Sequence, residues 1–423
     1  MNISATETQQ RDSLSQATDG STIRLAQFAS RALADELTGR IGVRAAETVA
    51  LDLSQEAVGP DWVASVEGTS RALLDTLGET VNASSLPIVV VLRVDDTHTA
   101  VSTAARNAVK GVIGVAALEA ADTGRRVNAV AINQTTTDRD LRATVEYLSD
   151  DDAAGYTTGI TIDLTRQAPG HQPVGDRDEA PILVTGGAGG LGRAYAEALV
   201  AAGRKVIISD LESDALRATA DELNAPYVAC DVTSAAAVED LAKNPLVASG
   251  LAGLAVYHGV GGSGGIGQLT PGVRDRSLVI NGTGVYNVVN ALVPALQRGR
   301  PGSVMILASQ AGLIAERGGG AYCAAKFAAV GYAEALAEEL SDSGVRVHSV
   351  CPGPVDTALL RNAFAGMAAV EGMSYDEYRN SRMQEIPLRR FGQPEQIAAA
   401  TSLLLDLDAT GVVLPATGGI VLT

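Results

Sequence analysis

After residue 180, short runs of aliphatic and β-branched residues alternate with alanine-rich stretches that have helical spacing. The strand-like runs are PILVTG, KVIISD, PYVACDV, LAVYHG, SVMILAS, RVHSVCPG and GVVLP, and helix-like stretches lie at 190–203, 213–223, 284–297 and 321–342. Strands that alternate with helices form βαβ units, in which the strands lie parallel. The pattern therefore predicts an α/β fold with a doubly wound, Rossmann-type parallel sheet of about seven strands.

The 423 residues are too many for one ordinary domain. Residues 166–180, RQAPGHQPVGDRDEA, combine proline, glycine and charge without apolar periodicity, which is typical of a linker. We therefore predict a smaller α/β domain over 1–165 and a larger domain over 181–423.

The first domain resembles part of the second. Residues 101–131 align without gaps on 321–351 at a constant offset of 220, which indicates an internal duplication, although any alanine-rich helix followed by a strand aligns in a similar way. In this alignment Tyr322 corresponds to Ser102 and Lys326 to Arg106. The TGRIG segment at 38–42 follows a helix-like stretch rather than an apolar strand. We therefore expect a degenerate Rossmann- or flavodoxin-like copy without cofactor or catalytic motifs.

Charge and composition narrow the classes of partner. A net charge of −17 disfavours nucleic acid and anionic membrane surfaces, and no run of 18 or more uncharged apolar residues is present. The polar N-terminus lacks an export signal, so we expect a cytoplasmic protein. Cys230, Cys323 and Cys351 have no metal-like spacing and are predicted to be buried thiols, and no metal site is expected.

A glycine loop, Thr185 to Gly192, follows the apolar run PILV and opens a helix. Glycines allow a tight turn and a close approach to a pyrophosphate, whose charge then meets the helix N-terminus. A glycine cluster alone would be an ordinary loop as often as not, but its position between a strand and a helix favours a dinucleotide site.

Asp210 ends the next strand-like run, about 20 residues beyond the glycines. A carboxylate there accepts hydrogen bonds from the adenosine ribose hydroxyls and repels a 2′-phosphate. No lysine or arginine lies within the glycine loop or directly after Asp210, so we predict NAD(H) as the cofactor. The alternative is that Asp210 only ends a strand in a turn. Asp231 and Val232, which close the third strand, are expected beside the adenine.

Tyr322 and Lys326 are four positions apart on one predicted helix, so they share a face. An ammonium near a phenol favours the phenolate, which would make Tyr322 a proton-transfer group near neutral pH. Ser309 ends the strand SVMILAS and is placed to hold a substrate carbonyl oxygen. Asn281, at the start of NGTGVYNVV, is expected to position a water near Lys326. Alone, a tyrosine and lysine at this spacing more often form a solvated helix face.

With these residues in order, 180–423 resembles a short-chain dehydrogenase/reductase over the full length of that family's domain. The matching motifs are TGGAGGLG, CDV, NGTG, Ser309, YCAAK and CPGPVDT. The resemblance implies hydride transfer to or from a nicotinamide, with Asn281, Ser309, Tyr322 and Lys326 as a catalytic tetrad. It implies that the cofactor is held by Gly186, Ala188, Gly189, Gly190, Leu191, Gly192, Asp210, Leu211, Asp231, Val232, Gly259, Tyr322, Lys326, Pro352, Gly353, Val355 and Thr357.

One position departs from the family pattern. His258-Gly259-Val260 stands where the family has Asn-Ala-Gly, so the usual asparagine that braces the sheet is absent. His258 either replaces its hydrogen bond or fills space at a strand end.

The fusion of a degenerate domain to an intact reductase resembles the high-molecular-weight branch of the 3-oxoacyl-[acyl-carrier-protein] reductases. That resemblance implies NADH-dependent reduction of 3-oxoacyl thioesters, carried by acyl-carrier protein or coenzyme A, by a homodimer, with a homotetramer as the alternative. The competing hypotheses are an NAD-dependent secondary alcohol, sterol or sugar dehydrogenase and, from another class, an NAD-binding scaffold or sensor. Residues 357–390 are expected to form a substrate lid, or a helix that packs on the core, and Arg298 and Arg300 either meet an acidic carrier or are surface arginines.

Overall fold

The computed structural model describes residues 15–16, 22–25, 47–52, 68–83, 86–94, 100–168, 180–262, 266–267, 269–298 and 302–423. The TGRIG segment, residues 169–179 of the predicted linker and Arg300 lie outside this set. Here the N-terminal half means the described residues up to 168, and the C-terminal half means those from 180.

The C-terminal half contains the predicted sheet of seven strands, all parallel. They are β7 (Ile182–Thr185), β8 (Val206–Asp210), β9 (Tyr227–Ala229), β10 (Gly253–Val256), β11 (Ser303–Leu307), β12 (Arg346–Pro352) and β13 (Val413–Ala416). The spatial order is β13-β12-β11-β10-β7-β8-β9, so the chain leaves β7 toward β8 on one side and returns to β10 on the other. A ligand crevice is expected at this switch point, beyond the carboxyl ends of the strands.

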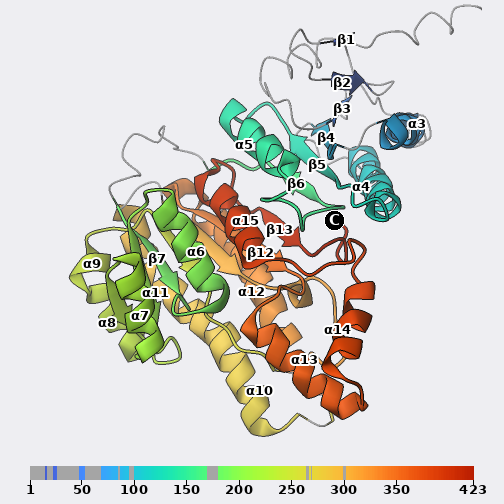
Figure 1. The fold of residues 1–423 in the computed structure, drawn as a ribbon. Helices are drawn as coiled ribbons and strands as arrows, with labels where there is room; N and C mark the ends of the chain where they lie inside the picture. The colour runs from blue at the N-terminus through green and yellow to red at the C-terminus, as the bar shows by residue number, and fades with distance from the viewer. Residues whose placement is uncertain are drawn as a thin grey trace, which may run out of the picture.

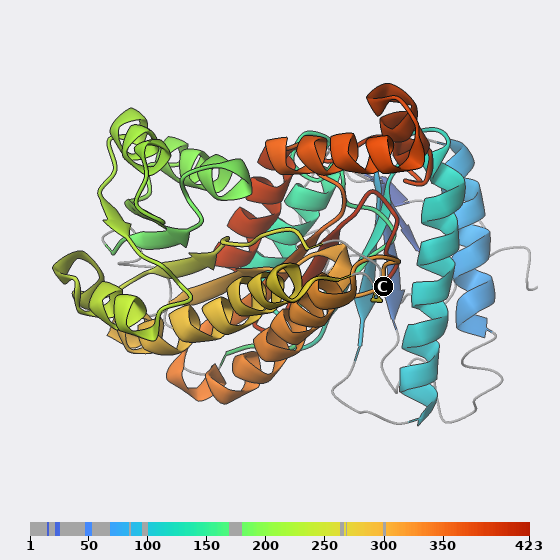
Figure 2. The same cartoon turned by 90° about the horizontal axis from the view of Figure 1, so that it is seen from below.

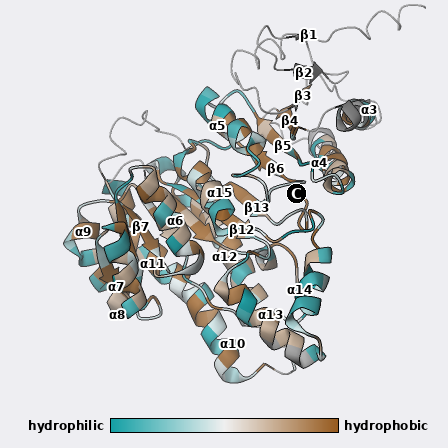
Figure 3. Cartoon of the chain, viewed as in Figure 1, coloured by the Kyte–Doolittle hydropathy of each residue, from teal (hydrophilic) through white to brown (hydrophobic). Residues whose placement is uncertain are grey.

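Helices cover both faces of this sheet (Figures 1 and 2). On one face, α6 (Gly190–Ala201), α7 (Asp214–Leu223) and α15 (Pro394–Asp406) contribute to one apolar cluster with the strands. On the other, α8 (Ala235–Lys243), α9 (Pro245–Ala248), α11 (Gly284–Arg298) and α12 (Gly320–Glu339) contribute to a second cluster. The strands are brown in Figure 3 because both of their faces are buried, as expected for a parallel sheet.

The predicted lid consists of two helices, α13 (Ala358–Glu371) and α14 (Tyr375–Gln384), which pack against each other. They project from the sheet on the side where β12 ends (Figure 1). Thr357 caps α13 and Ser374 forms a capping box with Glu377 at the start of α14. These caps account for two helices where the sequence pattern indicated one helical segment.

One helical stretch, 271–298, is long and apolar enough to cross a membrane by length and composition alone. It consists of α10 (Pro271–Leu278), a π-helical turn η3 (Val279–Thr283) and α11. Its residues Val285, Val288, Val289, Leu292 and Leu296 belong to the second core cluster. Packing against the protein's own sheet therefore explains the apolar side chains on this inner face.

The N-terminal half contains a six-stranded sheet in the order β1 to β6. Its strands are β1 (Ser15–Gln16), β2 (Thr22–Leu25), β3 (Glu47–Asp52), β4 (Ile88–Arg93), β5 (Val127–Ile132) and β6 (Thr161–Asp163), and all pairs except β1 with β2 are parallel. α3 (Gly68–Ala83) and α4 (Ala100–Ala121) pack on one face, and α5 (Asp138–Ser149) packs on the other. A second α/β unit therefore precedes the larger sheet.

The same backbone pattern recurs in both halves at the positions that the internal alignment pairs. The Val127 N–H donates to Thr158 Oγ1 and its carbonyl accepts from Gly159, at 3.1 and 2.8 Å. The Val347 N–H likewise donates to Thr410 Oγ1 and its carbonyl accepts from Gly411, again at 3.1 and 2.8 Å. Such agreement in detail supports an internal duplication over a chance alignment of helices.

A fully buried arginine also occurs in each half at these paired positions. Arg126 and Arg346 are each 1% exposed and begin the segments that become β5 and β12. Arg126 donates to the Leu148 carbonyl and Arg346 to the Leu405 carbonyl, at the ends of α5 and α15. Each guanidinium therefore joins a strand to the last turn of the helix that precedes the next strand of its sheet, where carbonyl groups lack helical partners.

The two halves pack directly against each other through α5 and α15, which are adjacent in Figure 1. The buried Asp140 carboxylate accepts the backbone N–H groups of Asp408 and Ala409 at 2.8–2.9 Å. Gln167 forms an antiparallel bridge with Ala409. Residues 166–168 were predicted to be linker, but in the structure they run along the C-terminal half.

The C-terminal tail makes the reciprocal contact. Gly418 N–H donates to the Tyr156 carbonyl at 2.8 Å, and Thr423 N–H donates to the Gly159 carbonyl at 3.1 Å. Leu422 packs over Gly114 and Gly159 of the N-terminal half. Each half therefore holds the segment that follows the other half's last strand.

We expect Asp140→Ala to lower the free energy of unfolding by about 3 kcal/mol, because two buried backbone N–H groups lose their acceptor. Urea unfolding measures the change. Glu146→Ala, an exposed position on the same helix, serves as the control and should change stability by less than about 0.5 kcal/mol. Equal stability of the two variants would contradict this role for Asp140.

Candidate active site

One cavity of about 650 Å³ lies at the switch point of the C-terminal sheet. Asn281, Ser309, Tyr322 and Lys326 line it. The predicted cofactor residues that line it are Gly186, Gly189, Gly190, Leu191, Gly192, Asp210, Leu211, Asp231, Val232, Gly259, Pro352, Gly353, Val355 and Thr357, together with Tyr322 and Lys326. Ala188 alone of the predicted residues is not in the lining, and its backbone N–H donates to the Asp210 carboxylate.

The glycine loop turns from β7 into α6 with almost no room for side chains. Gly186 has a φ of 69°, and a Cβ there would lie 2.6 Å from the His258 nitrogen. A Cβ on Gly192 would overlap the Gly186 carbonyl oxygen. The N-cap of α6 is Gly189, which has no side-chain cap, so the first N–H groups of the helix face the cavity without a side-chain partner. This is a cradle that fits an anion such as a pyrophosphate.

Asp210 lies at the carboxyl end of β8 and is partly buried. Its two carboxylate oxygens accept the backbone N–H groups of Ala188, at 3.1 Å, and Leu211, at 2.8 Å. These bonds fix the carboxylate against the glycine loop and leave each oxygen a further lone pair. Asp231 is held similarly by Thr233, whose hydroxyl and N–H lower the pKa of the Asp231 carboxyl.

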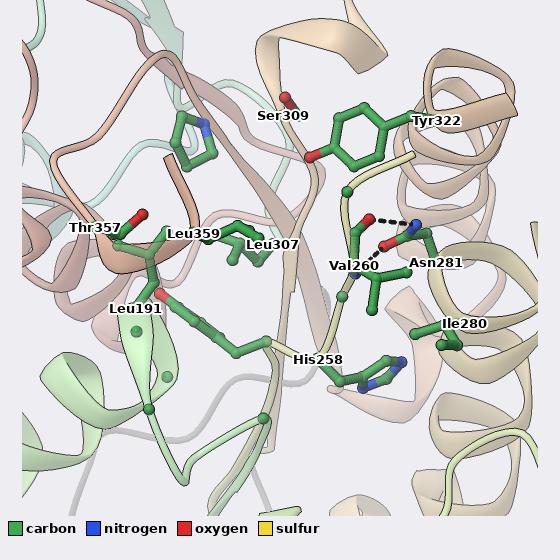
Figure 4. A pocket seen from close by; sticks show the side chains of 18 of the residues that line it. Leu191, His258, Val260, Ile280, Asn281, Leu307, Ser309, Tyr322, Thr357 and Leu359 are labelled. Carbon is green, nitrogen blue, oxygen red and sulfur yellow. Dashed lines mark hydrogen bonds between the residues drawn. The ribbon is translucent and has the colours of Figure 1, made fainter. Parts of the chain in front are cut away.

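Tyr322 and Lys326 lie on one face of α12, with the Lys326 nitrogen 5.7 Å from the centre of the tyrosine ring. The lysine is 3% exposed and donates to the Leu307 carbonyl at 2.8 Å. The side chains of Tyr322 and Ser309 lie next to each other beside the cavity (Figure 4). Ser309, Tyr322 and Lys326, three of the four predicted catalytic residues, thus come together where β11 ends and α12 begins.

The electrostatics differ from the expectation that Lys326 favours the Tyr322 phenolate. Burial raises the pKa of Tyr322, Ser309 opposes this by hydrogen bonding, and Glu316 raises the pKa further. Burial also lowers the pKa of Lys326 to about 8. The Lys326 ammonium is bonded to the Leu307 carbonyl, and burial is the largest influence on the pKa of each of the two groups. The tyrosine is therefore a neutral phenol at pH 7, which suits a proton donor.

Asn281 does not begin a helix, as predicted, but lies inside the continuous 271–298 helix. It occupies the π-helical turn, and the Gly284 N–H donates five residues back to Val279. The Asn281 amide donates to the carbonyls of Ser277 and Val260 at 2.9 Å and accepts the Val260 N–H at 3.0 Å (Figure 4). The side chain thus replaces ladder bonds of the helix and holds the loop after β10, as π-turns at functional sites commonly do.

His258 braces the sheet where the family has asparagine. Its Nδ1 lies 2.8 Å from Thr185 Oγ1, which joins the end of β10 to the end of β7. Nε2 is buried and has no hydrogen-bond partner among the described residues. Burial and the charge of Lys326 lower the pKa of His258 to about 3, so the ring is neutral.

Sequence patterns missed several lining residues. Gln310 and Glu316 bond to each other at 2.7 Å beside Ser309, and the exposed Arg276 lines the cavity from α10. Leu359 and Leu360 of α13 add an apolar wall. The position of Gln310, directly after a predicted site residue, carried a signal, and Leu359 and Leu360 fall within the predicted lid segment 357–390. The three cysteines are buried and free, as predicted.

The family model for short chain dehydrogenase matches residues 180–368. A 2-(S)-hydroxypropyl-CoM dehydrogenase of Xanthobacter autotrophicus is 32% identical over 56% of this chain and 95% of the relative. The chain is a short-chain dehydrogenase/reductase. A sorbitol dehydrogenase of Cereibacter sphaeroides is 31% identical over 56% of this chain and 94% of that protein. A crystal structure of an actinorhodin polyketide ketoreductase with NADPH matches with a TM-score of 0.55, at 26% identity, and covers 58% of this chain and 99% of the other.

Membership of the short-chain dehydrogenase/reductase family makes this protein an oxidoreductase that acts on CH–OH or C=O groups with an NAD(P)-binding Rossmann fold. The similar curated proteins are named as alcohol, diol and sugar-alcohol dehydrogenases. Each of these matches covers little more than half of this chain.

We expect stability to fall as the pH drops below about 6.5, the ordinary pKa of histidine. His258 and His348 are buried and neutral in the folded state, each with a pKa lowered to about 3, whereas the unfolded chain takes up protons near 6.5. Each histidine therefore contributes a loss of up to about 1.4 kcal/mol per pH unit between these values. Urea unfolding at pH 7.5 and pH 5.5 measures it.

Two variants separate this effect from other acid titrations. His258→Asn and His348→Leu remove one titrating group each and should flatten the pH dependence relative to the unaltered protein. An unchanged slope in both variants would show that these histidines do not control acid stability.

Proposed function

We propose that this protein catalyses the NAD(H)-dependent oxidation of secondary alcohols and the reverse reduction of ketones. The main observation behind this proposal is that the hydroxyl-bearing side chains of Tyr322 and Ser309 line the same cavity as the glycine loop and Asp210. Support for alcohols as substrates comes from the similar curated proteins, which are alcohol, diol and sugar-alcohol dehydrogenases.

The residues of the cavity fit a nicotinamide dinucleotide. The uncapped start of α6 and the space left by Gly186 and Gly192 suit the pyrophosphate, and Asp210 suits the adenosine ribose. Pro352, Gly353, Val355 and Thr357 line the same cavity and would hold the nicotinamide. When bound, the nicotinamide accepts or supplies a hydride at the substrate carbon.

The protein's own groups handle the proton. In reduction, the neutral Tyr322 phenol donates its proton to the carbonyl oxygen, which Ser309 holds by a hydrogen bond. Lys326, cationic below a pKa of about 8, stabilises the phenolate that remains until a proton returns from solvent. In oxidation the same phenolate removes the hydroxyl proton, so this direction should be favoured at alkaline pH.

A 3-oxoacyl thioester is a second candidate substrate, and the wall formed by α13 favours it. Leu359 is 62% exposed although it lines the cavity, which gives an extended acyl chain an apolar surface. Arg276 places a cation in the lining that can meet an anionic carrier group. Arg298, which was expected either to meet a carrier or to be a surface arginine, donates to the Ala248 carbonyl at 3.0 Å.

The test compares substrates under one set of conditions. We expect oxidation of secondary alcohols and polyols with NAD, and Tyr322→Phe should lower kcat by about 10²–10⁴-fold because the proton donor is lost. Tyr332→Phe, on the same helix but outside the cavity lining, is the control. Turnover of acetoacetyl-CoA with NADH, without turnover of any alcohol, would favour the thioester reductase. Undiminished turnover by Tyr322→Phe would refute both candidate functions.

For cofactor choice, we expect Asp210→Ala to narrow the preference for NADH over NADPH in kcat/KM by about tenfold or more, because the carboxylate no longer repels a 2′-phosphate. Asp214→Ala removes a fully exposed carboxylate that is not in the lining and should leave the ratio unchanged. A ratio that is the same in both variants would rule out Asp210 as the selector.

A further inference from the structure

Tyr156 of the N-terminal half reaches the wall of the active-site cavity. It lies in the turn between α5 and β6 and is fully buried. Its ring belongs to an apolar cluster whose other members all come from the C-terminal half: Leu360, Phe364, Met383, Ile386, Phe391 and Ile420. Leu360 is also part of the cavity lining. A residue outside the tetrad-bearing half therefore supports the base of the lid helices.

Glycines of the C-terminal half make room for this ring. A Cβ on Gly392 or on Gly418 would lie 2.5 Å from Tyr156 ring carbons, and one on Gly353 would lie 3.1 Å from its hydroxyl oxygen. Real Cβ contacts below 3.0 Å essentially do not occur, so the ring is seated directly against backbone. Gly353 lies in the cavity lining, so the phenol contacts the lining from behind.

Backbone hydrogen bonds connect this seat to the cavity loop. Gly392 donates to the Pro354 carbonyl at 3.0 Å and accepts from Asp356 at 2.9 Å, which pairs it with Val355 in a parallel bridge. Pro354 and Val355 line the cavity. On the other side, Gly418 N–H holds the Tyr156 carbonyl at 2.8 Å. Displacement of the ring would therefore move the wall of the cavity.

Two polar groups, the Tyr156 hydroxyl and Gln310 Oε1, lie next to this loop. Both are buried and have no hydrogen-bond partner among the described residues. They lie 3.1 and 3.0 Å from the same point, the Cβ position of Gly353. The Gly392 N–H is near enough to lower the pKa of the phenol, but it already donates to Pro354, and burial keeps the hydroxyl protonated. A donor and an acceptor are thus both placed against the Gly353 backbone.

We propose that Tyr156 is a positioning residue for the reaction site. Its ring fixes the Gly353–Val355 wall, and its hydroxyl lies against Gly353 beside Gln310, which follows Ser309 and bonds Glu316. The N-terminal half thereby completes an active site whose tetrad it does not carry. The inference rests on the proposed oxidoreductase function of this cavity, and it extends that function to a residue of the other half.

The experiment compares Tyr156→Phe and Tyr156→Leu with Tyr147→Phe in the full-length protein. Tyr147 is a buried tyrosine of α5 whose hydroxyl bonds Thr157 at 3.0 Å, and it does not line the cavity or belong to the Tyr156 cluster. We expect Tyr156→Phe to lower kcat/KM about tenfold and Tyr156→Leu about 100-fold, since small misplacements at a reaction site have effects of this size. Tyr147→Phe should lower the melting temperature but leave kcat/KM within about twofold.

A double-mutant cycle separates positioning from general stability. The effects of Tyr156→Phe and Gln310→Ala on kcat/KM should be non-additive if the two groups together hold Gly353 in place, whereas a loss of fold stability would not couple to Gln310. Wild-type kcat/KM in both Tyr156 variants, at temperatures where they are folded, would overturn the proposal.

Cofactor affinity provides a readout that does not depend on turnover. NADH fluorescence titration should show weaker binding by Tyr156→Leu than by Tyr147→Phe, because the wall at Gly353 has moved. If the unaltered protein binds NADH but reduces none of the test substrates, the proposed function fails while this titration still tests Tyr156. Equal affinities in both variants would count against the positioning role.

Discussion

The hydrogen bonds that join the two halves at the edge of the C-terminal sheet are the constraint on which the site depends. β13 is the last strand of that sheet, and residues on both sides of it are held by the N-terminal half through Asp140, Gln167 and Tyr156. An exposed edge strand is prone to fraying and to incorrect pairing. Here the residues before and after the edge strand are held by the second α/β unit of the same chain. Because β13 pairs with β12, which leads into the Pro352 loop, these contacts also fix one wall of the cavity.

Comparison of the aligned segments of the two halves separates residues that build the fold from residues that perform chemistry. The buried arginines Arg126 and Arg346 and the threonine bonds to Val127 and Val347 occur in both halves, where they join a strand to its neighbouring turn. Tyr322 and Lys326 have no equivalents, since serine and arginine stand at the aligned positions of the N-terminal half. The first half therefore retains packing without the proton-transfer pair. It contributes to the active site through its contacts with the C-terminal half.

Local sequence signals were sufficient for most of the C-terminal fold and for the residues around the cavity. The strands are continuous apolar runs, and the glycine loop is marked by the strand before it and the helix after it, so the seven strands and the lining of the cavity were predictable. The π-turn at Asn281 was not, because the side chain replaces a helical bond that only the folded backbone defines. Gln310, Glu316 and Tyr156 were missed because their roles arise from contacts between distant segments. The pKa of Tyr322 was misjudged because helix spacing shows its neighbour but not the loss of solvent.

Electrostatics also explain how a histidine can stand where the family has an asparagine. His258 and Lys326 are both buried near the end of β10, and a charged imidazole there would repel the ammonium. Burial and that repulsion keep the ring neutral at physiological pH, and a neutral imidazole, like an amide side chain, carries both a donor and an acceptor. Nδ1 uses one of these with Thr185, which ties β10 to β7. The exchange therefore preserves the brace beneath the glycine loop without adding charge to the cavity, although Nε2 has no hydrogen-bond partner among the described residues, and the lowered pKa makes stability sensitive to acid.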